Sequence, residues 1–348
     1  MKKSTKIGIT ISIIVILIAL ALYIFLPKLN ICMKRLSPIL GRLFLILIIV
    51  ISAISCNKTP QFKNIEGWSP EINSRLKAFL DSTVNLNERK VAVFDGDGTV
   101  FGQVPFYLAD EALYRYADLN YKGKTDSLSV SKMRILEAMV ADGNNVGKPY
   151  VEDRVHFLSG MAPEEVAELG YQCFLESYKN KFYPEMKALI ENLKEYGFEV
   201  WILTASPEYL YQKFIATELN LPVINIVGVK SVIVDGKLTN EIVMPIPQDD
   251  GKANTIPTYI KARPLIVGGN SRGDMDMINQ SKGLKIVVNP DHITVRGQDD
   301  GPMHGFTVKS YWEKEGALIV TCNDVRDTTK RFHTAEWKIR ENVAHPKK

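Results

Sequence analysis

The stretch Lys90-Val-Ala-Val-Phe94, which runs directly into Asp95-Gly-Asp97-Gly-Thr99, decides the fold of this chain. An unbroken apolar run of this length is typical of a central strand in a parallel sheet, where both faces are buried. The two Asp-Gly pairs then end the strand, and the glycines on either side of Asp97 leave the backbone free to approach a ligand closely. Because ligands bind beyond the carboxyl ends of such strands, this break predicts a functional loop.

Four further apolar runs predict strands at residues 198–203, 223–227, 264–267 and 284–288. Residues 230–234 with Asp235-Gly236 predict a hairpin turn between strands. Helical spacing over residues 184–196, ended by Gly197, and over 208–219 separates the runs. Strands that alternate with helices predict an α/β fold, a three-layer, doubly wound, mainly parallel sheet of Rossmann-like type.

Residues 107–178 show helical spacing without a clear strand. This segment is too long to be one crossover between neighbouring strands, so it predicts an inserted helical cap. Before the first strand, Ser69-Pro70-Glu71 predicts a helix start, with an N-cap serine, a proline at the first position and an acidic first turn.

Polar residues follow three separate apolar strands at the edge where parallel strands end. These residues are Asp95, Asp97, Thr99, Thr204, Ser206, Asn270 and Asp274. Chance rarely places hydroxyl, amide and carboxylate groups at three strand ends. Their convergence predicts a single site.

The ordered set of motifs resembles the haloacid dehalogenase-like hydrolase superfamily. Residues 91–99 resemble its first motif, hhhhDxDGT, and residues 200–204 resemble its second, a strand that ends in Ser or Thr. Lys252 matches its third motif, and Gly269-Asn270-Ser-Arg-Gly-Asp274 resembles its fourth, GDxxxD. The resemblance covers residues 90–290 and implies a phosphohydrolase with the corresponding sheet and an inserted cap.

The resemblance assigns roles that suit each residue type. Asp95 would attack phosphorus and form an aspartyl-phosphate, which splits hydrolysis into two easier steps. Asp97 would act as the general acid and base, a role that contributes about 10²–10⁴-fold to rates. Lys252 and Thr204 would hold the phosphoryl oxygens. Three further residues are expected at the substrate: Gly98, Thr99 and Ser206. Because Asp97 can protonate a leaving group, a phosphatase is favoured over a dehalogenase.

The same resemblance implies a Mg²⁺ cofactor, which prefers hard oxygen ligands. Asp95, the backbone carbonyl of Asp97, and Asn270 or Asp274 would supply them. The superfamily usually has Asp where this chain has Asn270. A neutral ligand at that position should weaken Mg²⁺ binding unless Asp274 coordinates directly.

The predicted cap is similar in position to that of phosphoserine phosphatases. Arg154-Val-His-Phe-Leu resembles their Arg-Val-x-Leu-Leu segment, whose arginine grips the substrate carboxylate. Arg154 is therefore expected to bind substrate, or else to form a salt bridge within the cap. The family has a glutamate for the substrate amine where Val104 stands. Nearby aromatic residues, Phe101, Phe106 and Tyr107, would suit a quaternary ammonium or simply pack the cap on the core.

Two apolar runs at the N-terminus predict a membrane attachment. Residues 7–26 are long enough to span a bilayer, and residues 43–54 follow basic residues and end at Ser55-Cys56. The second run resembles a bacterial lipoprotein signal with Cys56 as the acylated residue, which places the protein on the membrane outside the cytoplasm. Translation could begin at Met33, in which case residues 1–32 are upstream sequence; otherwise they are an additional anchor.

The predicted organisation has six parts. They are an apolar segment 1–32, a lipoprotein-type signal 33–56, a tether and first helix 57–86, a hydrolase core 87–105 and 180–290, a helical cap 106–179, and a C-terminal extension 291–348 without an assigned role. The net charge of +4 is too small and too dispersed to suggest nucleic-acid binding. Cys173 and Cys322 are either paired or separately buried.

The expected partners are therefore a small phosphorylated substrate and the membrane, without nucleic acid. Two other functions stay open: a catalytically weak lipoprotein that binds a phosphorylated ligand, and a phosphotransferase of the same fold.

Overall fold

The computed structural model describes residues 59–142 and 147–346, and all structural statements concern these residues. The predicted apolar segment, lipoprotein signal and Cys56 lie outside them. Within the described part of the chain, no helix is long and apolar enough to cross a membrane.

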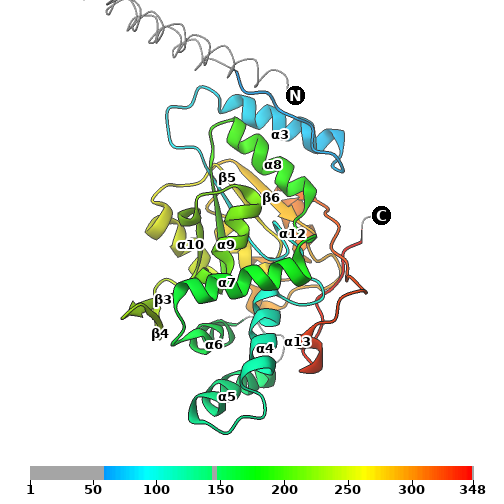
Figure 1. The fold of residues 1–348 in the computed structure, drawn as a ribbon. Helices are drawn as coiled ribbons and strands as arrows, with labels where there is room; N and C mark the ends of the chain where they lie inside the picture. Colours follow the sequence, from blue (N-terminus) through cyan, green and yellow to red (C-terminus); the bar gives the residue numbers. More distant parts are fainter. Residues whose placement is uncertain (1–58, 143–146, 347–348) are drawn as a thin grey trace, which may run out of the picture. The chain divides into compact units, whose positions relative to one another are not determined.

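A seven-stranded sheet forms the centre of the described chain, in the order β4-β3-β2-β1-β5-β6-β7. All neighbouring strands are parallel except the β3–β4 pair. The strands are β1 (Val91–Asp95), β2 (Glu199–Pro207), β3 (Ile226–Val234), β4 (Lys237–Val243), β5 (Ile266–Gly269), β6 (Leu284–Val288) and β7 (Leu318–Val320). The predicted doubly wound α/β fold is confirmed, and Figure 1 shows its helices around the sheet.

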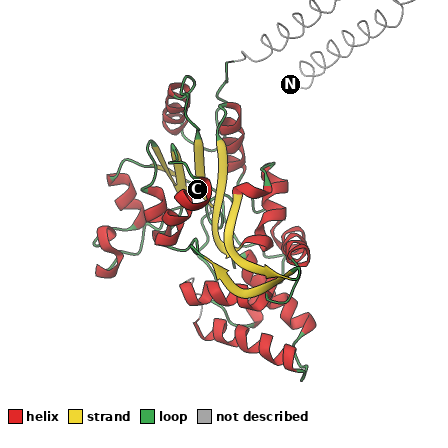
Figure 2. Ribbon diagram, turned by 90° about the vertical axis from the view of Figure 1, so that its left-hand side faces the viewer, coloured by secondary structure: helices red, strands yellow, loops and turns green. Residues whose placement is uncertain are grey.

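Strand β1 lies at the middle of the sheet because its unbroken apolar run suits burial on both faces. All five of its residues are buried. On one face, Ala92 and Phe94 belong to a core cluster with α3 (Pro70–Ser82), α8 (Pro184–Glu195) and α9 (Glu208–Leu219). On the other face, Val91 and Val93 pack with α11 (Met275–Ile278) and α12 (Val308–Lys314). These are the three predicted layers, and Figure 2 shows the strands between helices.

Several predicted boundaries agree with the structure. The side chain of Ser69 accepts a hydrogen bond from the Ile72 N–H and caps α3 as expected. The predicted hairpin joins β3 and β4, where Asp235 and Gly236 both have positive φ, at 49° and 75°. Both cysteines of the described chain, Cys173 and Cys322, are free and buried.

One predicted strand starts too early, and one strand of the sheet was not predicted. Residues 223–225 form the 3-10 turn η3 (Val223–Asn225), and the third strand begins only at Ile226. Val223 and Ile224 are 51% and 73% exposed, so their apolar character does not reflect burial in the sheet. The extension after residue 290 was given no strand, yet its residues Leu318–Val320 form β7 and pair with β6.

The predicted helical insert lies between β1 and β2. It consists of α4 (Leu108–Asn120), α5 (Ser127–Asp142), α6 (Lys148–Leu158), α7 (Pro163–Cys173) and the π-helix η2 (Phe174–Tyr178). The remaining short helices are α10 (Asp250–Thr255), η4 (Ile256–Ile260), η5 (Arg272–Asp274), η6 (Gln298–Met303) and α13 (His333–Glu336).

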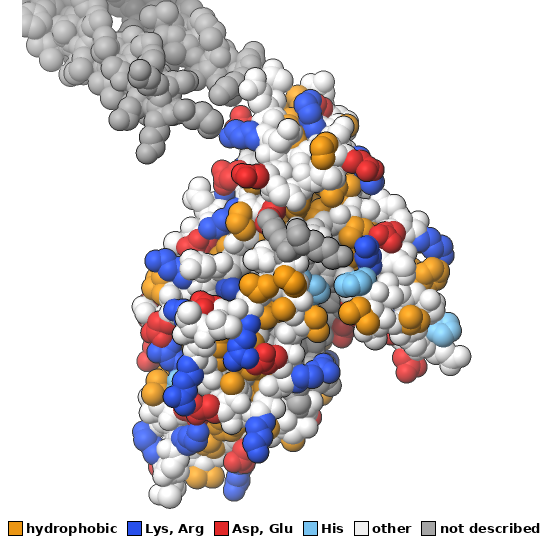
Figure 3. Space-filling view, turned by 90° about the vertical axis from the view of Figure 1, so that its right-hand side faces the viewer, with side chains coloured by type: hydrophobic (Ala, Val, Ile, Leu, Met, Phe, Trp, Pro, Cys, Tyr) orange, Lys and Arg blue, Asp and Glu red, His pale blue; other side chains and the backbone are white. Residues whose placement is uncertain are grey.

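The C-terminal extension connects the sheet to the cap. After β7 the chain reaches α13, where the N–H groups of His333 and Thr334 donate to the Glu111 carboxylate of α4, each at 3.0 Å. The Thr334 hydroxyl donates to the same carboxylate at 2.8 Å, and the Trp337 ring packs on Tyr114. Figure 3 shows the side of the molecule on which basic, acidic and hydrophobic side chains are interspersed. The extension thus fastens the first cap helix to the core.

Candidate active site

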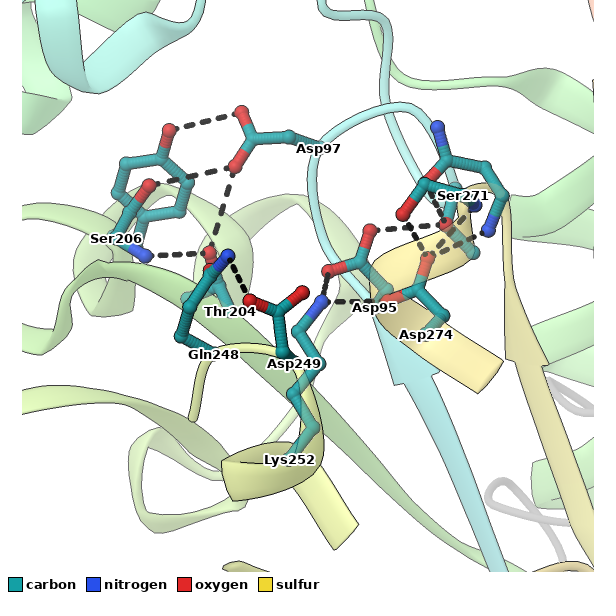
Figure 4. A network of polar contacts seen from close by, with 12 residues as sticks. Asp95, Asp97, Thr204, Ser206, Gln248, Asp249, Lys252, Ser271 and Asp274 are labelled. Carbon is teal, nitrogen blue, oxygen red and sulfur yellow. Dashed lines mark hydrogen bonds and ion pairs between the residues drawn. The ribbon is translucent and has the colours of Figure 1, made fainter. Parts of the chain in front are cut away.

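The polar residues predicted to converge do so at the carboxyl ends of β1, β2 and β5 (Figure 4). Asp95 is the last residue of β1 and pairs in register with Leu203 of β2, so Thr204 is the next residue of that strand. A cavity of about 320 Å³ opens here. Its lining includes the predicted site residues Asp95, Asp97, Arg154, Thr204, Ser206, Lys252 and Asn270.

Lys252 joins two buried carboxylates. Its ammonium nitrogen lies 2.6 Å from Asp95 Oδ1 and 2.6 Å from Asp274 Oδ1. Burial raises the pKa of Asp95 to about 7, the Lys252 charge opposes this, and the neighbouring Asp274 adds to it. Burial also disfavours the charge of Lys252, but Asp274 and Asp95 outweigh this and raise the pKa of the ammonium. Lys252 therefore stays charged beside the predicted nucleophile.

Asp274 has no unengaged carboxylate oxygen. Its Oδ1 accepts from Lys252, and its Oδ2 accepts from the Asn270 N–H at 3.0 Å and from the Ser271 N–H and hydroxyl at 2.9 and 3.0 Å. Although burial alone would raise it, Lys252 and the Ser271 and Asn270 N–H groups keep the pKa of Asp274 below its usual value. This carboxylate holds the loop after β5 and the lysine in place.

Asp97 is surrounded by hydroxyl groups. The Tyr211 hydroxyl donates to Asp97 Oδ1 at 2.9 Å, and the hydroxyls of Thr204 and Ser206 lie 3.4 and 3.5 Å from Oδ2. Burial raises the pKa of Asp97 to about 6, and the Tyr211 hydrogen bond is the largest effect in the opposite direction. A carboxyl group with such a pKa is suited to give and take a proton near neutral pH.

The loop Gly96–Thr99 depends on a glycine at position 98. Gly98 has φ +78°, and a Cβ there would lie 2.2 Å from Asn270 Nδ2. Its N–H donates to the Phe101 carbonyl at 2.7 Å, so that N–H serves the loop itself. Thr99 donates to Asp95 Oδ2 at 3.1 Å. Gly98, Thr99 and Asp274 do not line the cavity, so the predicted contacts of Gly98 and Thr99 with substrate stay predictions.

The residues suited to Mg²⁺ are few but of the right chemical type. The Thr99 hydroxyl lies 3.1 Å from Asp95 Oδ2 and 3.5 Å from Asn270 Oδ1, so both oxygens lie beside the same hydroxyl group. With the Asp97 backbone carbonyl they form a hard oxygen set, which fits Mg²⁺ with waters in its remaining positions. No group of three or more His, Cys, Asp or Glu side chains is arranged for a metal in the described chain, consistent with the neutral Asn270 in the set. Because both oxygens of Asp274 are engaged, Asn270 is the better candidate ligand.

Arg154 combines the two alternatives that the sequence left open. It lines the cavity, and it also makes two contacts with Asp110 Oδ1 of α4, from Nε at 2.9 Å and from Nη2 at 2.8 Å. The guanidinium lies 5.4 Å from the Tyr107 ring centroid and 4.9 Å from that of Tyr150. Only 2% of the Arg154 side chain is exposed, and its charge is largely matched within the cap. Among the aromatic residues predicted at the mouth, Phe101 and Phe106 are buried in the core, and Tyr107 lines the cavity.

Sequence reasoning missed Tyr211, which contacts Asp97 from outside the lining, and several residues that line the cavity. Tyr211 stands in the first turn of α9, directly after the second motif, and this position was the available signal. Its hydroxyl also accepts from the Ala109 N–H of the cap at 3.2 Å. Asp249 precedes α10 with φ 48° and ψ −123°, an uncommon conformation for a residue other than glycine. The other lining residues without a predicted role are Gln103, Ala205, Gln248, Ser271, Arg272, Gly273 and Arg296.

Comparisons with known proteins agree with this geometry. The model of one family, described as haloacid dehalogenase-like hydrolase, matches residues 92–279. The chain is 24% identical over 229 residues to phosphoserine phosphatase SerB1 of Mycobacterium tuberculosis strain H37Rv, across 64% of this chain and 67% of that protein.

Two solved structures of proteins with unknown function share the fold. One, from Anaerococcus prevotii, superposes with a TM-score of 0.55 at 17% identity, over 76% of this chain and 94% of that one. The other, from Bordetella pertussis, gives a TM-score of 0.51 at 14% identity, over 67% and 99%.

Proposed function

Because the chain belongs to the haloacid dehalogenase-like hydrolase family, we propose that it hydrolyses a small phosphomonoester with Asp95 as nucleophile and Asp97 as general acid and base. The observation that carries the proposal is that these two carboxylates line one cavity, with the Lys252 ammonium beside Asp95 and three hydroxyl groups around Asp97. Asp95 is held by Lys252, and Asp97 has a raised pKa and a hydrogen-bonded orientation. The similarity to a phosphoserine phosphatase is consistent with a phosphate ester as substrate.

The first step forms a bond between a carboxylate oxygen of Asp95 and phosphorus as the ester P–O bond breaks. Asp97 gives its proton to the departing oxygen, so the alcohol leaves neutral. In the second step, Asp97 takes a proton from water, the water oxygen attacks phosphorus, and the acyl phosphate bond breaks. Orthophosphate leaves and the Asp95 carboxylate is restored.

The cationic and hydroxyl groups around the cavity stabilise the negative charge of the transferred group. Lys252 Nζ is fixed between two carboxylates, so its side chain does not have to be ordered during the reaction. Mg²⁺, held by Asp95, the Asp97 carbonyl and Asn270, would neutralise further phosphoryl charge. With Asn270 in place of a carboxylate, we expect this ion to bind more weakly than at an all-carboxylate site.

The test is turnover of p-nitrophenyl phosphate by the full chain in detergent, with Mg²⁺ and with EDTA. Release of p-nitrophenol and orthophosphate in equal amounts, lost with EDTA and in Asp95→Asn, supports the proposal. Acid-quenched enzyme should also carry a phosphoryl group on the peptide that contains Asp95. Turnover that survives Asp95→Asn contradicts the assigned nucleophile.

The same assay separates the other functions. Less orthophosphate than p-nitrophenol in the presence of an acceptor alcohol would indicate a phosphotransferase. Binding of orthophosphate without turnover would indicate a phospho-ligand-binding protein, for which Asn270 is the favouring observation.

The proposed location is the membrane, outside the cytoplasm, with Cys56 acylated. This proposal rests on the pattern of residues 33–56. Metabolic labelling with a fatty acid in a bacterial host should label the wild-type protein and fail to label Cys56→Ser. Labelling of the variant would exclude Cys56 as the acylated residue.

A further inference from the structure

Two arginines to which the family resemblance assigns no catalytic role line the same cavity as Asp95. Arg272 lies in the loop after β5, and Arg296 follows β6 in the C-terminal extension, beyond the segment that the family model matches. The proposed mechanism uses neither of them. Their presence in a cavity of about 320 Å³ places them within reach of the same small ligand.

Carboxylates of the extension position both guanidinium groups. Arg272 Nε lies 3.5 Å from Asp300 Oδ1, and Arg296 Nη2 lies 3.3 Å from Asp291 Oδ2. Asp291 and Asp300 do not line the cavity, so each contacts its arginine from behind the cavity wall. The Nε–H groups of Arg272 and Arg296 are both buried and have no hydrogen-bond acceptor in the described chain, so the hydrogen-bonding capacity of the two guanidinium groups is not fully used.

These arginines are more accessible than the cations already assigned. The Arg272 and Arg296 side chains are each 26% exposed, whereas those of Arg154 and Lys252 are 2% and 8% exposed. Arg154 is held by Asp110 at 2.8 Å, a closer contact than either extension carboxylate makes. A second anionic group on a substrate would therefore meet Arg272 and Arg296 more readily than Arg154.

Cationic side chains outnumber carboxylates in the lining of the cavity, and each of these cations also contacts a carboxylate. Four cationic side chains line it against three carboxylates, those of Asp95, Asp97 and Asp249. Gln248 Nε2 donates to the Asp249 carboxylate at 3.2 Å, so this acid has a partner of its own. Guanidinium groups present forked donors that match carboxylate and phosphate oxygens.

We propose that Arg272 and Arg296 form a second anion subsite, so that the preferred substrate is a small phosphomonoester with a further carboxylate or phosphate group. This inference rests on the proposed function, because it assigns the scissile phosphate to Asp95. It gives the C-terminal extension a role in substrate selection.

The experiment compares matched substrates. The carboxylate arm is 3-phosphoglycerate against glycerol 3-phosphate, and the phosphate arm is fructose 1,6-bisphosphate against fructose 6-phosphate. The readout is the ratio of kcat/KM within each pair for the full-length enzyme. We expect a ratio of about ten or more in at least one arm, the size expected for a hydrogen bond to a charged group at a partly exposed site.

Substitutions then test the residues. Arg296→Gln and Arg272→Gln should each lower the ratio about tenfold, and Arg296→Lys should restore part of it because it keeps the charge without the fork. Arg331→Gln is the matched control, since this arginine of the extension is 87% exposed and does not line the cavity. Its ratio should equal that of the wild type. Thermal unfolding of each variant identifies any that misfold.

Two results overturn the proposal: ratios near one in both arms of an active wild type, or ratios that Arg272→Gln and Arg296→Gln leave unchanged. If no substrate is hydrolysed, the proposed function fails and calorimetry with the same pairs still measures the subsite. Tighter binding of the member that carries the additional anionic group, lost in Arg296→Gln, would then support the subsite alone, and equal binding would refute it.

Discussion

The Tyr211 hydroxyl controls the proton affinity of Asp97, and Tyr211→Phe is the most informative single change at the site. The hydrogen bond is 2.9 Å long, and it joins the buried Tyr211 to the partly buried Asp97. Burial and the Asp97 charge raise the pKa of Tyr211 well above its ordinary value, so the phenol keeps its proton and donates it in a hydrogen bond. The phenylalanine variant removes only this hydroxyl.

The magnitude follows from the strength of the bond. A hydrogen bond to a charged group contributes about 1.5–3 kcal/mol, and one pKa unit corresponds to about 1.4 kcal/mol. The Tyr211 bond favours the ionised form of Asp97 and lowers its pKa. Because Asp97 is only partly buried, we take the lower end of this range, and the loss of the bond should raise the pKa of Asp97 by about one unit.

The sign in the assay is set by the role of Asp97 in the first step. The general acid must be protonated, so the rate with a poor leaving group falls as the pH rises through the pKa of about 6. In Tyr211→Phe this fall should move to a pH about one unit higher. The measurement is kcat against pH with an alkyl phosphate, for which leaving-group protonation limits the rate.

Tyr209→Phe is the matched control, because Tyr209 lies in the same turn of α9 and makes no hydrogen bond with Asp97 in the described part of the chain. Its pH profile should follow that of the wild type. A Tyr211→Phe profile that loses amplitude at every pH without moving along the pH axis would refute this reasoning. It would mean that Tyr211 serves only to hold the cap through the Ala109 N–H.

Two further changes test the framework of the site. Gly98→Ala should remove most activity and destabilise the fold, because its Cβ would lie 2.2 Å from Asn270 Nδ2. Gly123→Ala is the control, because Gly123 has the same φ of +78° but a Cβ there would meet no atom within 4 Å, so this variant measures the backbone strain alone. Equal losses of stability in Gly98→Ala and Gly123→Ala would contradict a clash between the Cβ at position 98 and Asn270. Glu111→Ala should lower the free energy of unfolding by about 1–3 kcal/mol in urea titration, because it leaves the buried N–H of Thr334 without an acceptor. An unchanged free energy would contradict the proposed fastening of the cap.

The sheet and the site motifs were predictable because each depends on short, local patterns. The apolar run before Asp95 fixes β1 at the centre, and the strand predicted at residues 284–288 matches β6 at both ends. The exception at residues 223–225 has a physical cause. A pattern reports how apolar a residue is, and Val223 and Ile224 are apolar and yet exposed.

The remaining features depend on contacts between distant parts of the chain. Strand β7 has only three residues within a charged extension, and it becomes a strand because the edge of β6 is available for pairing. Asp110 and Arg154 are separated by 44 residues, and nothing local in either helix indicates that they meet. The same holds for Glu111 and Thr334, which are 223 residues apart.

The Asp110–Arg154 pair also limits how far the family resemblance extends to the substrate. If a substrate carboxylate replaced Asp110 as the partner of Arg154, the carboxylate of Asp110 would stay buried without a cation. Losing one partner of a buried ion pair costs about 3–5 kcal/mol, which a new contact at Arg154 would have to offset. No such exchange is needed at Arg272 and Arg296, which are more exposed and more loosely held. The energetics therefore favour the proposed subsite at Arg272 and Arg296 over Arg154 as the place that would bind a second anionic group of the substrate.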